Sequence, residues 1–281
     1  MGRTVKVAGV QIAARPDVER TTKRALELLA LAASRGAQIA VLPELWAYPW
    51  FVGQLENDTR RLAQPADGPL LAAMREKAAT HKMMLVVPFF EIDKENGNAY
   101  NSAAVIDDKG KLSGVYRKMH LPQIPGWEEK SFFTPGDKGF CLFDSPAGPL
   151  GVQLGWDLMF PEGLRLLTLG GANLVVAPMA VTAANDDLWE RAVLTGAFAN
   201  GLWLCRVGRA GAENGTTFAG RSLCATPTGD LLDEPMSDAE GVCIWEIDPR
   251  ATPLVRRNWP FLRDRRPDQY GALSAPKKDE A

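Results

Sequence analysis

One turn of this chain has the form of a turn that carries a nucleophile, and a glycine stands at its tip. Residues 148–154 (GPLGVQL) are apolar enough for a buried strand, and Pro161 suits the first turn of a helix. Glu162 complements the positive end of that helix. A sharp turn between strand and helix presents one side chain at position 155, where Gly155 has none. The sequence therefore predicts a site from which the attacking group is missing.

Three charged residues elsewhere could take part in the chemistry of such a site. Glu44 follows an apolar strand in AVLPELW, Lys118 lies in YRKMHLP, and Glu129 lies in EEKSFFTPGD. Taken alone, each has an ordinary explanation: a solvated carboxylate or helix cap at 44, a solvated lysine beside a surface Arg117, and a solvated loop at 129. Strand ends are nevertheless where α/β proteins place chemistry, which makes Glu44 a candidate site residue.

These blocks resemble the nitrilase (carbon–nitrogen hydrolase) superfamily, whose members carry I-C-[YFW]-D-x-x-F-P-E-x-x-R at this turn. The chain reads LGWDLMFPEGLR over 154–165, and the cysteine is the element that it lacks. Further matches lie between about Val5 and about Tyr270: YNSAAVID at 100–107, FTPGD at 133–137, GAFANG at 196–201 and FAGRS at 218–222. The segments KMHLP, PGWEEKSFFTPGD and FLRDRRPDQYG fit best the subgroup of N-carbamoylputrescine amidases and β-ureidopropionases.

The resemblance implies a role for each residue of the site. Glu44, Lys118 and Gly155 stand at the three positions of the family's Glu-Lys-Cys triad. Glu44 is implied as the general base, which needs hydrogen-bond reach to the nucleophile's proton. Lys118, together with the backbone N–H of Trp156, is implied to stabilise the oxyanion of the tetrahedral intermediate.

Other residues are expected to hold the substrate. The resemblance implies that Glu129 orients the substrate or the lysine, without transferring a proton. Trp127 and Asn200 complete the expected substrate-binding residues. Four aromatic residues follow AVLPEL: Trp46, Tyr48, Trp50 and Phe51. For these residues and for Trp127, packing in the core or in an oligomer interface is a more frequent role than contact with a substrate.

The missing thiol bears directly on activity. The family mechanism needs a thiolate that attacks an amide, carbamoyl or nitrile carbon, after which water cleaves the thioester or thioimidate. In another covalent hydrolase, loss of the nucleophile costs about a millionfold in turnover. Slow attack by water, assisted by Glu44, is the remaining route. Cys205 lies in the apolar strand GLWLCRVG, where a buried cysteine is usually inert packing, and we do not expect it to replace the thiol.

A second glycine departs from the subgroup pattern. GLWLCRVGRAG aligns with G-x-P-V-V-x-x-N-R-x-G, which puts Gly208 where an asparagine is expected. Two changed positions favour natural divergence into a pseudoenzyme, and a deliberate inactivating substitution is the other interpretation. The sequence predicts an amide or N-carbamoyl amine hydrolase that is inactive or severely impaired. The alternative is a non-catalytic protein that binds a small amide or carbamoyl compound, or a partner protein.

Composition argues against several classes of function. The formal net charge of −2, without long runs of one sign, gives no reason to expect nucleic acid or a membrane as a partner. Four scattered cysteines without a CxxC pair and only two histidines argue against a zinc or haem site, and no metal or other cofactor is expected. The N-terminus has no apolar stretch for a leader or a membrane span, so we expect a cytoplasmic protein.

Strands and helices alternate along the chain and must position these residues. Strands are expected at 5–12, 37–42, 84–90, 99–106, 111–116, 140–143, 148–154, 172–177, 202–207, 221–226 and 242–246. Helices are expected at 18–34, 70–82, from about 161, and at 187–199. Together with the resemblance, this order predicts an α/β fold, a four-layer α-β-β-α sandwich, as one domain over residues 1–281. A tail from about 250 is expected to cross to a neighbouring subunit in a homodimer or larger oligomer.

Overall fold

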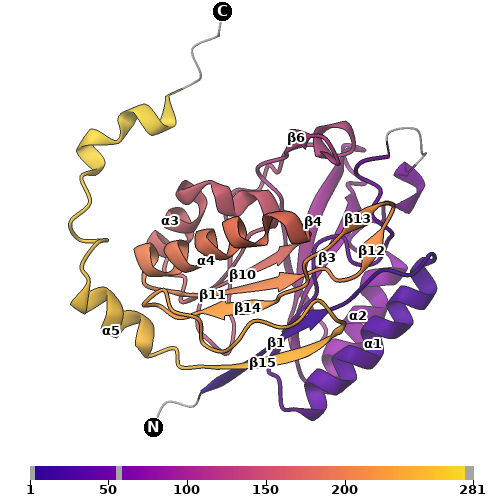
Figure 1. The fold of residues 1–281 in the computed structure, drawn as a ribbon, viewed down its shortest axis with the longest axis horizontal. Helices are drawn as coiled ribbons and strands as arrows, with labels where there is room; N and C mark the ends of the chain where they lie inside the picture. Colours follow the sequence, from indigo (N-terminus) through magenta and orange to yellow (C-terminus); the bar gives the residue numbers. More distant parts are fainter. Residues whose placement is uncertain (1–3, 55–58, 276–281) are drawn as a thin grey trace, which may run out of the picture.

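Two β-sheets packed face to face form the centre of the molecule (Figure 1). The computed structural model describes residues 4–54 and 59–275. The first sheet has the strand order β15 (Gly241–Ile247), β1 (Val5–Gln11), β2 (Ile39–Val41), β3 (Met84–Ile92), β4 (Ala99–Ile106) and β5 (Leu112–Arg117). The second has the order β14 (Leu223–Ala225), β11 (Trp203–Gly208), β10 (Leu174–Met179), β9 (Leu150–Val152) and β8 (Leu142–Phe143). Two short hairpins, β6–β7 (Gln123–Ile124, Trp127–Glu128) and β12–β13 (Ala212–Glu213, Thr216–Thr217), lie outside these sheets.

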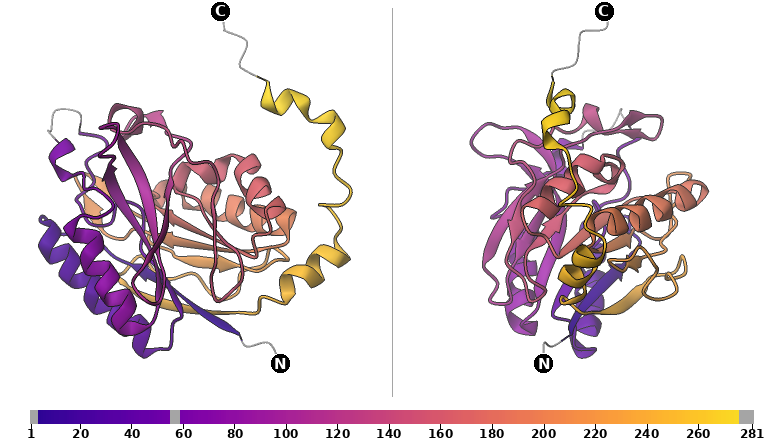
Figure 2. Two further views of the ribbon diagram at one scale, coloured as in Figure 1. Left: turned by 180° about the vertical axis from the view of Figure 1, so that it is seen from behind. Right: turned by 90° about the vertical axis from the view of Figure 1, so that its left-hand side faces the viewer.

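Helices cover the outer face of each sheet (Figures 1 and 2). The helices α1 (Val18–Ser34) and α2 (Pro69–His81) pack on the first sheet, and α3 (Pro161–Leu169) and α4 (Asp186–Asn200) pack on the second. Apolar side chains from both sheets, among them Val7, Val105, Val152 and Val176, fill the layer between the sheets. The four-layer α-β-β-α sandwich is therefore confirmed.

The local signals that predicted the elements act as expected. At the start of α1, the side chain of Asp17 accepts a hydrogen bond from the backbone N–H of Arg20 at 2.7 Å, a helix N-cap. The helix ends before Gly36, whose φ of +82° is the left-handed conformation that glycine adopts readily. Pro161 occupies the first position of α3, where its missing N–H costs nothing.

Strand β9 is shorter than predicted, and the reason concerns the site. Its predicted range reached 154, but the backbone N–H of Leu154 leaves the strand ladder and donates to the Asp157 carboxylate at 3.0 Å. The hairpins β6–β7 and β12–β13 were not predicted, because two-residue strands are too short to show periodicity.

After α5 (Ala251–Asn258), Trp259 and Phe261 still pack on Phe198 of α4, and the C-terminal tail leaves the body of the protein beyond them (Figures 1 and 2). Within α5, Arg256 donates to the backbone carbonyls of Ala172, just before β10, and of Asn200, at the end of α4. These hydrogen bonds attach α5 to the half of the molecule that contains the second sheet. Beyond α5, Trp259 and Leu273 are exposed. Within the described ranges, no helix is both long and apolar enough to cross a membrane.

The packing at Gly208 leaves no room for the asparagine that the subgroup pattern calls for. A Cβ added to Gly208 would lie 1.8 Å from the carbonyl oxygen of Gly220, and the Gly208 N–H donates to Ser222 Oγ at 3.0 Å. The FAGRS segment is therefore seated directly against this glycine.

We expect Gly208→Asn to destabilise the protein by roughly 1–3 kcal/mol or more, because the backbone of one segment must move. Urea unfolding followed by circular dichroism measures the change. Gly271→Ala, where an added Cβ meets nothing within 4 Å, is the matched control and should leave the midpoint in place. Equal midpoints for both variants would contradict this account of Gly208.

Candidate active site

The turn that carries Gly155 is held by a buried carboxylate. Asp157 accepts hydrogen bonds from the Leu154 N–H at 3.0 Å, from the Tyr116 hydroxyl at 2.7 Å and from the His120 N–H at 3.0 Å. Burial, and next the charge of Asp157, raise the pKa of Tyr116 well above its ordinary value, so this phenol stays protonated and donates. Strands β5 and β9 are thus fastened to the turn that opens the 3-10 helix η3 (Gly155–Met159).

Glu44, Lys118 and Glu129 meet in one buried cluster at this turn. Lys118 Nζ donates to Glu44 Oε1 at 2.7 Å and to Glu129 Oε1 and Oε2 at 2.6 and 2.8 Å. Asn101 Nδ2 donates to Glu44 Oε1 at 2.8 Å. All four residues are at most 2% exposed. The structure therefore brings together the three charged residues that sequence reasoning singled out, and adds Asn101 from β4.

Burial and charge compete within this cluster. Burial by itself lowers the pKa of Lys118, but the neighbouring charges of Glu129 and Glu44 outweigh that effect and raise it above its usual value. Burial, partly offset by the charge of Lys118, raises the pKa of Glu129 to about 7. Lys118 is therefore a fixed cation in an almost fully buried cluster, as stabilisation of an oxyanion requires.

Gly155 faces the carboxylate of Glu44. Gly155 has φ of +41°, and a Cβ built on it would lie 2.5 Å from Glu44 Oε2. Glu44 Oε1 is held by Lys118 and Asn101, so Oε2 is the oxygen left to turn toward a group at position 155. Any side chain there would emerge next to a carboxylate and would require that carboxylate to shift.

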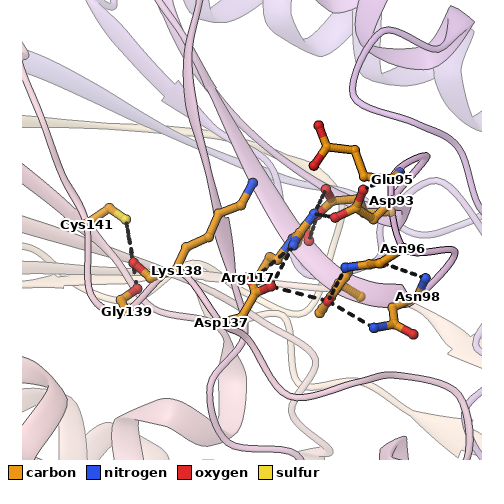
Figure 3. Close-up of polar contacts among 12 residues, drawn as sticks. Asp93, Glu95, Asn96, Asn98, Arg117, Asp137, Lys138, Gly139 and Cys141 are labelled. Carbon is orange, nitrogen blue, oxygen red and sulfur yellow. Dashed lines mark hydrogen bonds and ion pairs between the residues drawn. The ribbon is translucent and has the colours of Figure 1, made fainter.

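Arg117, the neighbour of Lys118, is buried and not a surface charge. Figure 3 shows its guanidinium group between Asp93 and Asp137. Nη2 lies 2.8 Å from Asp93 Oδ2 and 2.6 Å from Glu91 Oε1, and Nη1 lies 3.0 Å from Asp137 Oδ1. The group also lies over the ring of Tyr100, at 3.9 Å from its centroid. This network holds the end of β5 in place, and therefore also positions Lys118, the next residue.

The FTPGD block fixes the backbone of Lys118 from the other side. Gly136 N–H donates to the carbonyl of Lys118 at 2.8 Å, and Lys118 N–H donates to the carbonyl of Asn101 at 2.9 Å. A Cβ on Gly136 would lie 2.2 Å from the carbonyl oxygen of Arg117, so only glycine permits this approach. The glycine of FTPGD therefore has a packing cause.

A pocket of about 140 Å³ opens onto the cluster. Its lining residues are Glu44, Lys118, Pro122, Ile124, Pro125, Trp127, Glu129, Gly155, Trp156, Ala180, Val181, Thr182, Asn185 and Trp189. Trp127 and Trp156, two of the expected substrate-binding residues, are among them. Trp46 and Tyr48 are instead buried in the core, as the packing interpretation held.

The expectation for Asn200 is wrong. Asn200 is the last residue of α4, its Nδ2 donates to the carbonyl of Gly196 at 2.9 Å, and it lines a different hollow beside the C-terminal tail. Its place at the end of α4 carries its side chain to that hollow. Gly208 does not line the site pocket either.

Comparison with known proteins identifies the family. The sequence profile described as "Carbon-nitrogen hydrolase" matches residues 6–257. The chain belongs to the carbon–nitrogen hydrolase family. It is 33% identical to the N-carbamoylputrescine amidase of Arabidopsis thaliana, over 96% of this chain and 95% of that protein. It is 32% identical to the citrullinase of Francisella tularensis, over 96% and 98% respectively. A crystal structure of a carbon–nitrogen hydrolase from Helicobacter pylori matches with a TM-score of 0.92 at 32% identity, covering 98% of this chain and all of that one.

Asn101 and Trp189 are among the residues of this carbon–nitrogen hydrolase site that sequence reasoning did not single out. Asn101 lay in the matching block YNSAAVID, but an amide in a strand gives no sign of which carboxylate it will meet. Trp189 lay in the helix expected at 187–199, and only the packing of α4 shows that it faces the pocket. The signal for both lies in tertiary contacts.

We expect Arg117→Met to destabilise the fold by about 3–5 kcal/mol, because it leaves carboxylates buried without their cation. Urea unfolding at neutral pH measures the loss. Arg250→Met, which removes an exposed pair with Asp248, is the control and should change stability little. If both substitutions had the same small effect, the network would not anchor β5.

Proposed function

We propose that this chain is a carbon–nitrogen hydrolase-family protein whose site receives an amide or an N-carbamoyl amine, and that it hydrolyses this ligand slowly or not at all. The observation that carries the proposal is the buried cluster of Lys118, Glu44 and Glu129, which lies beside the turn that carries Gly155. The carboxylates and the lysine of a hydrolytic site are present, while position 155 offers no nucleophile.

The cluster suits a planar C–N group. Lys118 Nζ can donate to a carbonyl oxygen, and the backbone N–H of Trp156 belongs to the first turn of η3, where helix N–H groups have no partner within the helix. Glu44 Oε2 can accept a proton or an N–H of the ligand. Without a thiol, the chemistry left is attack by a water molecule. Glu44 takes a proton from the water as the C–O bond forms, and the proton passes to the ligand nitrogen, which leaves as the C–N bond breaks.

The names of two relatives favour the carbamoyl class. N-carbamoylputrescine and citrulline both end in a ureido group, in which a carbonyl carbon lies between two nitrogens. A ureido group combines the carbonyl acceptor that Lys118 can serve with N–H donors that the carboxylates of Glu44 and Glu129 can serve.

The alternative is a protein that binds such a ligand without turning it over. It is favoured by the position of Glu44 Oε2, which lies where it would crowd a side chain at position 155. The retained ion cluster argues against a site that has lost its function altogether, because a buried cation and two carboxylates are costly to keep.

We expect Gly155→Cys to release ammonia from N-carbamoyl amines at a measurable rate, provided that the Glu44 carboxylate turns aside. The unmodified chain should stay below detection, because loss of the nucleophile costs about a millionfold in a covalent hydrolase. Gly155→Ala is the matched control, since it adds the same Cβ without the sulfur. Ammonia is measured by a coupled enzymatic assay.

Two results would count against this assignment. Turnover by the unmodified chain that persists after Glu44→Ala and Lys118→Ala would show that the cluster is not the site. An inactive Gly155→Cys variant that still binds the ligand would instead favour the binding protein.

We also propose that the chain forms a homodimer or larger homo-oligomer through α3, α4 and the tail. Leu166 and Leu169 on α3, Leu188 on α4 and Leu273 in the tail are all at least 46% exposed. A hollow of about 890 Å³, lined by α3, α4 and residues 265–274, separates the tail from the helices. An exposed apolar surface of this kind is typical of a protein interface.

Polar atoms without a hydrogen-bond partner also favour an interface at this surface. Arg165 Nη1 and Asn200 Oδ1 are buried at this hollow without a hydrogen-bond partner, and buried polar atoms are normally paired. Burial lowers the pKa of Arg165. A second copy of the chain, seated on α3 and α4, would supply partners and cover the leucines.

We expect light scattering to give at least twice the chain mass of 30.6 kDa at micromolar concentration. Truncation after Phe261, which keeps α5 and the contacts of Trp259 and Phe261 with Phe198, should weaken association, and so should Leu166→Ser. Leu31→Ser, at an exposed position on α1 on the opposite side, is the control. A monomer for the full chain would refute the proposal.

A further inference from the structure

Two buried thiols face each other across neighbouring strands of the second sheet. Cys205 on β11 and Cys224 on β14 are directly opposed in the antiparallel pairing of these strands. Both residues are 0% exposed, and the Cys205 thiol donates to Cys224 Sγ across 3.0 Å. All four cysteines of the chain carry free thiols in this structure.

The backbone geometry of this pair suits a disulfide bond. Directly opposed residues on antiparallel strands have Cα atoms about 4.5 or 5.5 Å apart, and disulfides span about 4.4–6.8 Å between Cα atoms. A sulfur–sulfur bond of about 2.0 Å would require the two sulfur atoms to approach by roughly 1 Å. Neither strand has to change its register for this.

The other two cysteines have different neighbours. Cys243 lies on β15 of the first sheet, and its Sγ donates to the carbonyl of Gly9 at 3.5 Å. Cys141 is partly buried, and its Sγ donates to the carbonyl of Lys138 at 3.4 Å (Figure 3). Cys205 and Cys224 are therefore the pair that the fold brings into sulfur–sulfur contact.

The segment between these two cysteines supports the wall of the site pocket. Arg209 donates to the carbonyl of Leu45, the residue after Glu44, at 2.8 Å. The N–H of Ala219 donates to the carbonyl of Val181, a lining residue of the pocket, at 2.8 Å. A bond between the two thiols would close a loop that contains this segment, and such a loop restricts the freedom of the unfolded chain.

We propose that Cys205 and Cys224 are a site of oxidation, at which a peroxide converts the two thiols of the folded protein into a cross-strand disulfide. This inference does not depend on the proposed function. One sulfur attacks the O–O bond of hydrogen peroxide, which gives a sulfenic acid and one water molecule. The second sulfur then attacks the first, the S–O bond breaks, and the hydroxyl group leaves with the second thiol's proton as water. The two thiols lose two electrons, and the peroxide is reduced to two water molecules.

Burial makes this oxidation slow. Burial, and next the hydrogen bond with Cys205, raise the pKa of Cys224 well above its ordinary value, and a thiol is a weaker nucleophile than its thiolate. Strand β14 has three residues and lies at the edge of its sheet, next to β11. Local opening of a short edge strand costs less than global unfolding. We therefore expect peroxide to reach the thiols when β14 separates from β11.

The test follows oxidation of the reduced full chain by excess hydrogen peroxide. Samples are unfolded in N-ethylmaleimide, digested without reductant and analysed by mass spectrometry. We expect the main linked peptide to join Cys205 to Cys224, with a loss of about 2 Da for the two hydrogens. Oxidised protein should melt several degrees higher than reduced protein. Urea below the unfolding midpoint should speed formation of the link several-fold, because it favours the opening of β14.

Variants assign the bond to this pair. Cys205→Ala and Cys224→Ala should each abolish both the link and the shift in melting temperature. Cys141→Ala, which removes a thiol outside the pair, is the matched control and should retain both. The shift is measured between the oxidised and reduced forms of each variant, so that lost packing in the core does not affect the comparison. Circular dichroism verifies that each variant is folded.

Three results would overturn the inference. The first is a main link that joins Cys243 to either member of the pair. The second is the absence of a link between Cys205 and Cys224 when Cys141 has been oxidised completely. The third is a link that forms only above the unfolding midpoint, which would show that the folded protein does not make this bond.

Discussion

A lysine ammonium group buried between two carboxylates is the interaction on which this structure depends. Removing three charged groups from water costs several kcal/mol for each ion, and their mutual attraction repays this only where the geometry is good and further hydrogen bonds are made. Lys118, Glu44 and Glu129 meet at 2.6–2.8 Å, and Asn101 supplies a further donor. The cluster can exist only if the surrounding fold brings its members to these positions and buries most of their surface.

The fold meets this demand through backbone contacts next to Lys118. Its carbonyl is bound by the N–H of Gly136 and its N–H donates to the carbonyl of Asn101. Arg117 is held by acidic partners on β3, just after β3 and in the FTPGD segment. The Gly155 turn is fastened to the same strand through Asp157 and Tyr116. A side chain on one sheet is thus aligned with a turn on the other, because both are tied to β5.

Gly155 changes what this framework can do without disturbing it. The turn keeps its positive φ, its carboxylate anchor and its helix start at Pro161, none of which needs a side chain at 155. In the function that we propose, Lys118 and Glu44 would bind and polarise a ligand, and position 155 has no side chain that could attack it. Binding and attack would then depend on different residues.

The sequence by itself determined the order and approximate bounds of the main strands and helices, the sandwich class and the identity of Glu44, Lys118 and Glu129. These follow from local periodicity, from caps such as Asp17 and from blocks whose residue types carry the family resemblance. Tertiary structure alone decided that Asn101 joins the cluster, that Arg117 is buried and that Trp189 faces the pocket, because each depends on segments distant in sequence. It also removed Asn200 from the site and excluded a side chain at Gly208, since the end of α4 and the close approach of Gly220 are set by packing that no local pattern encodes.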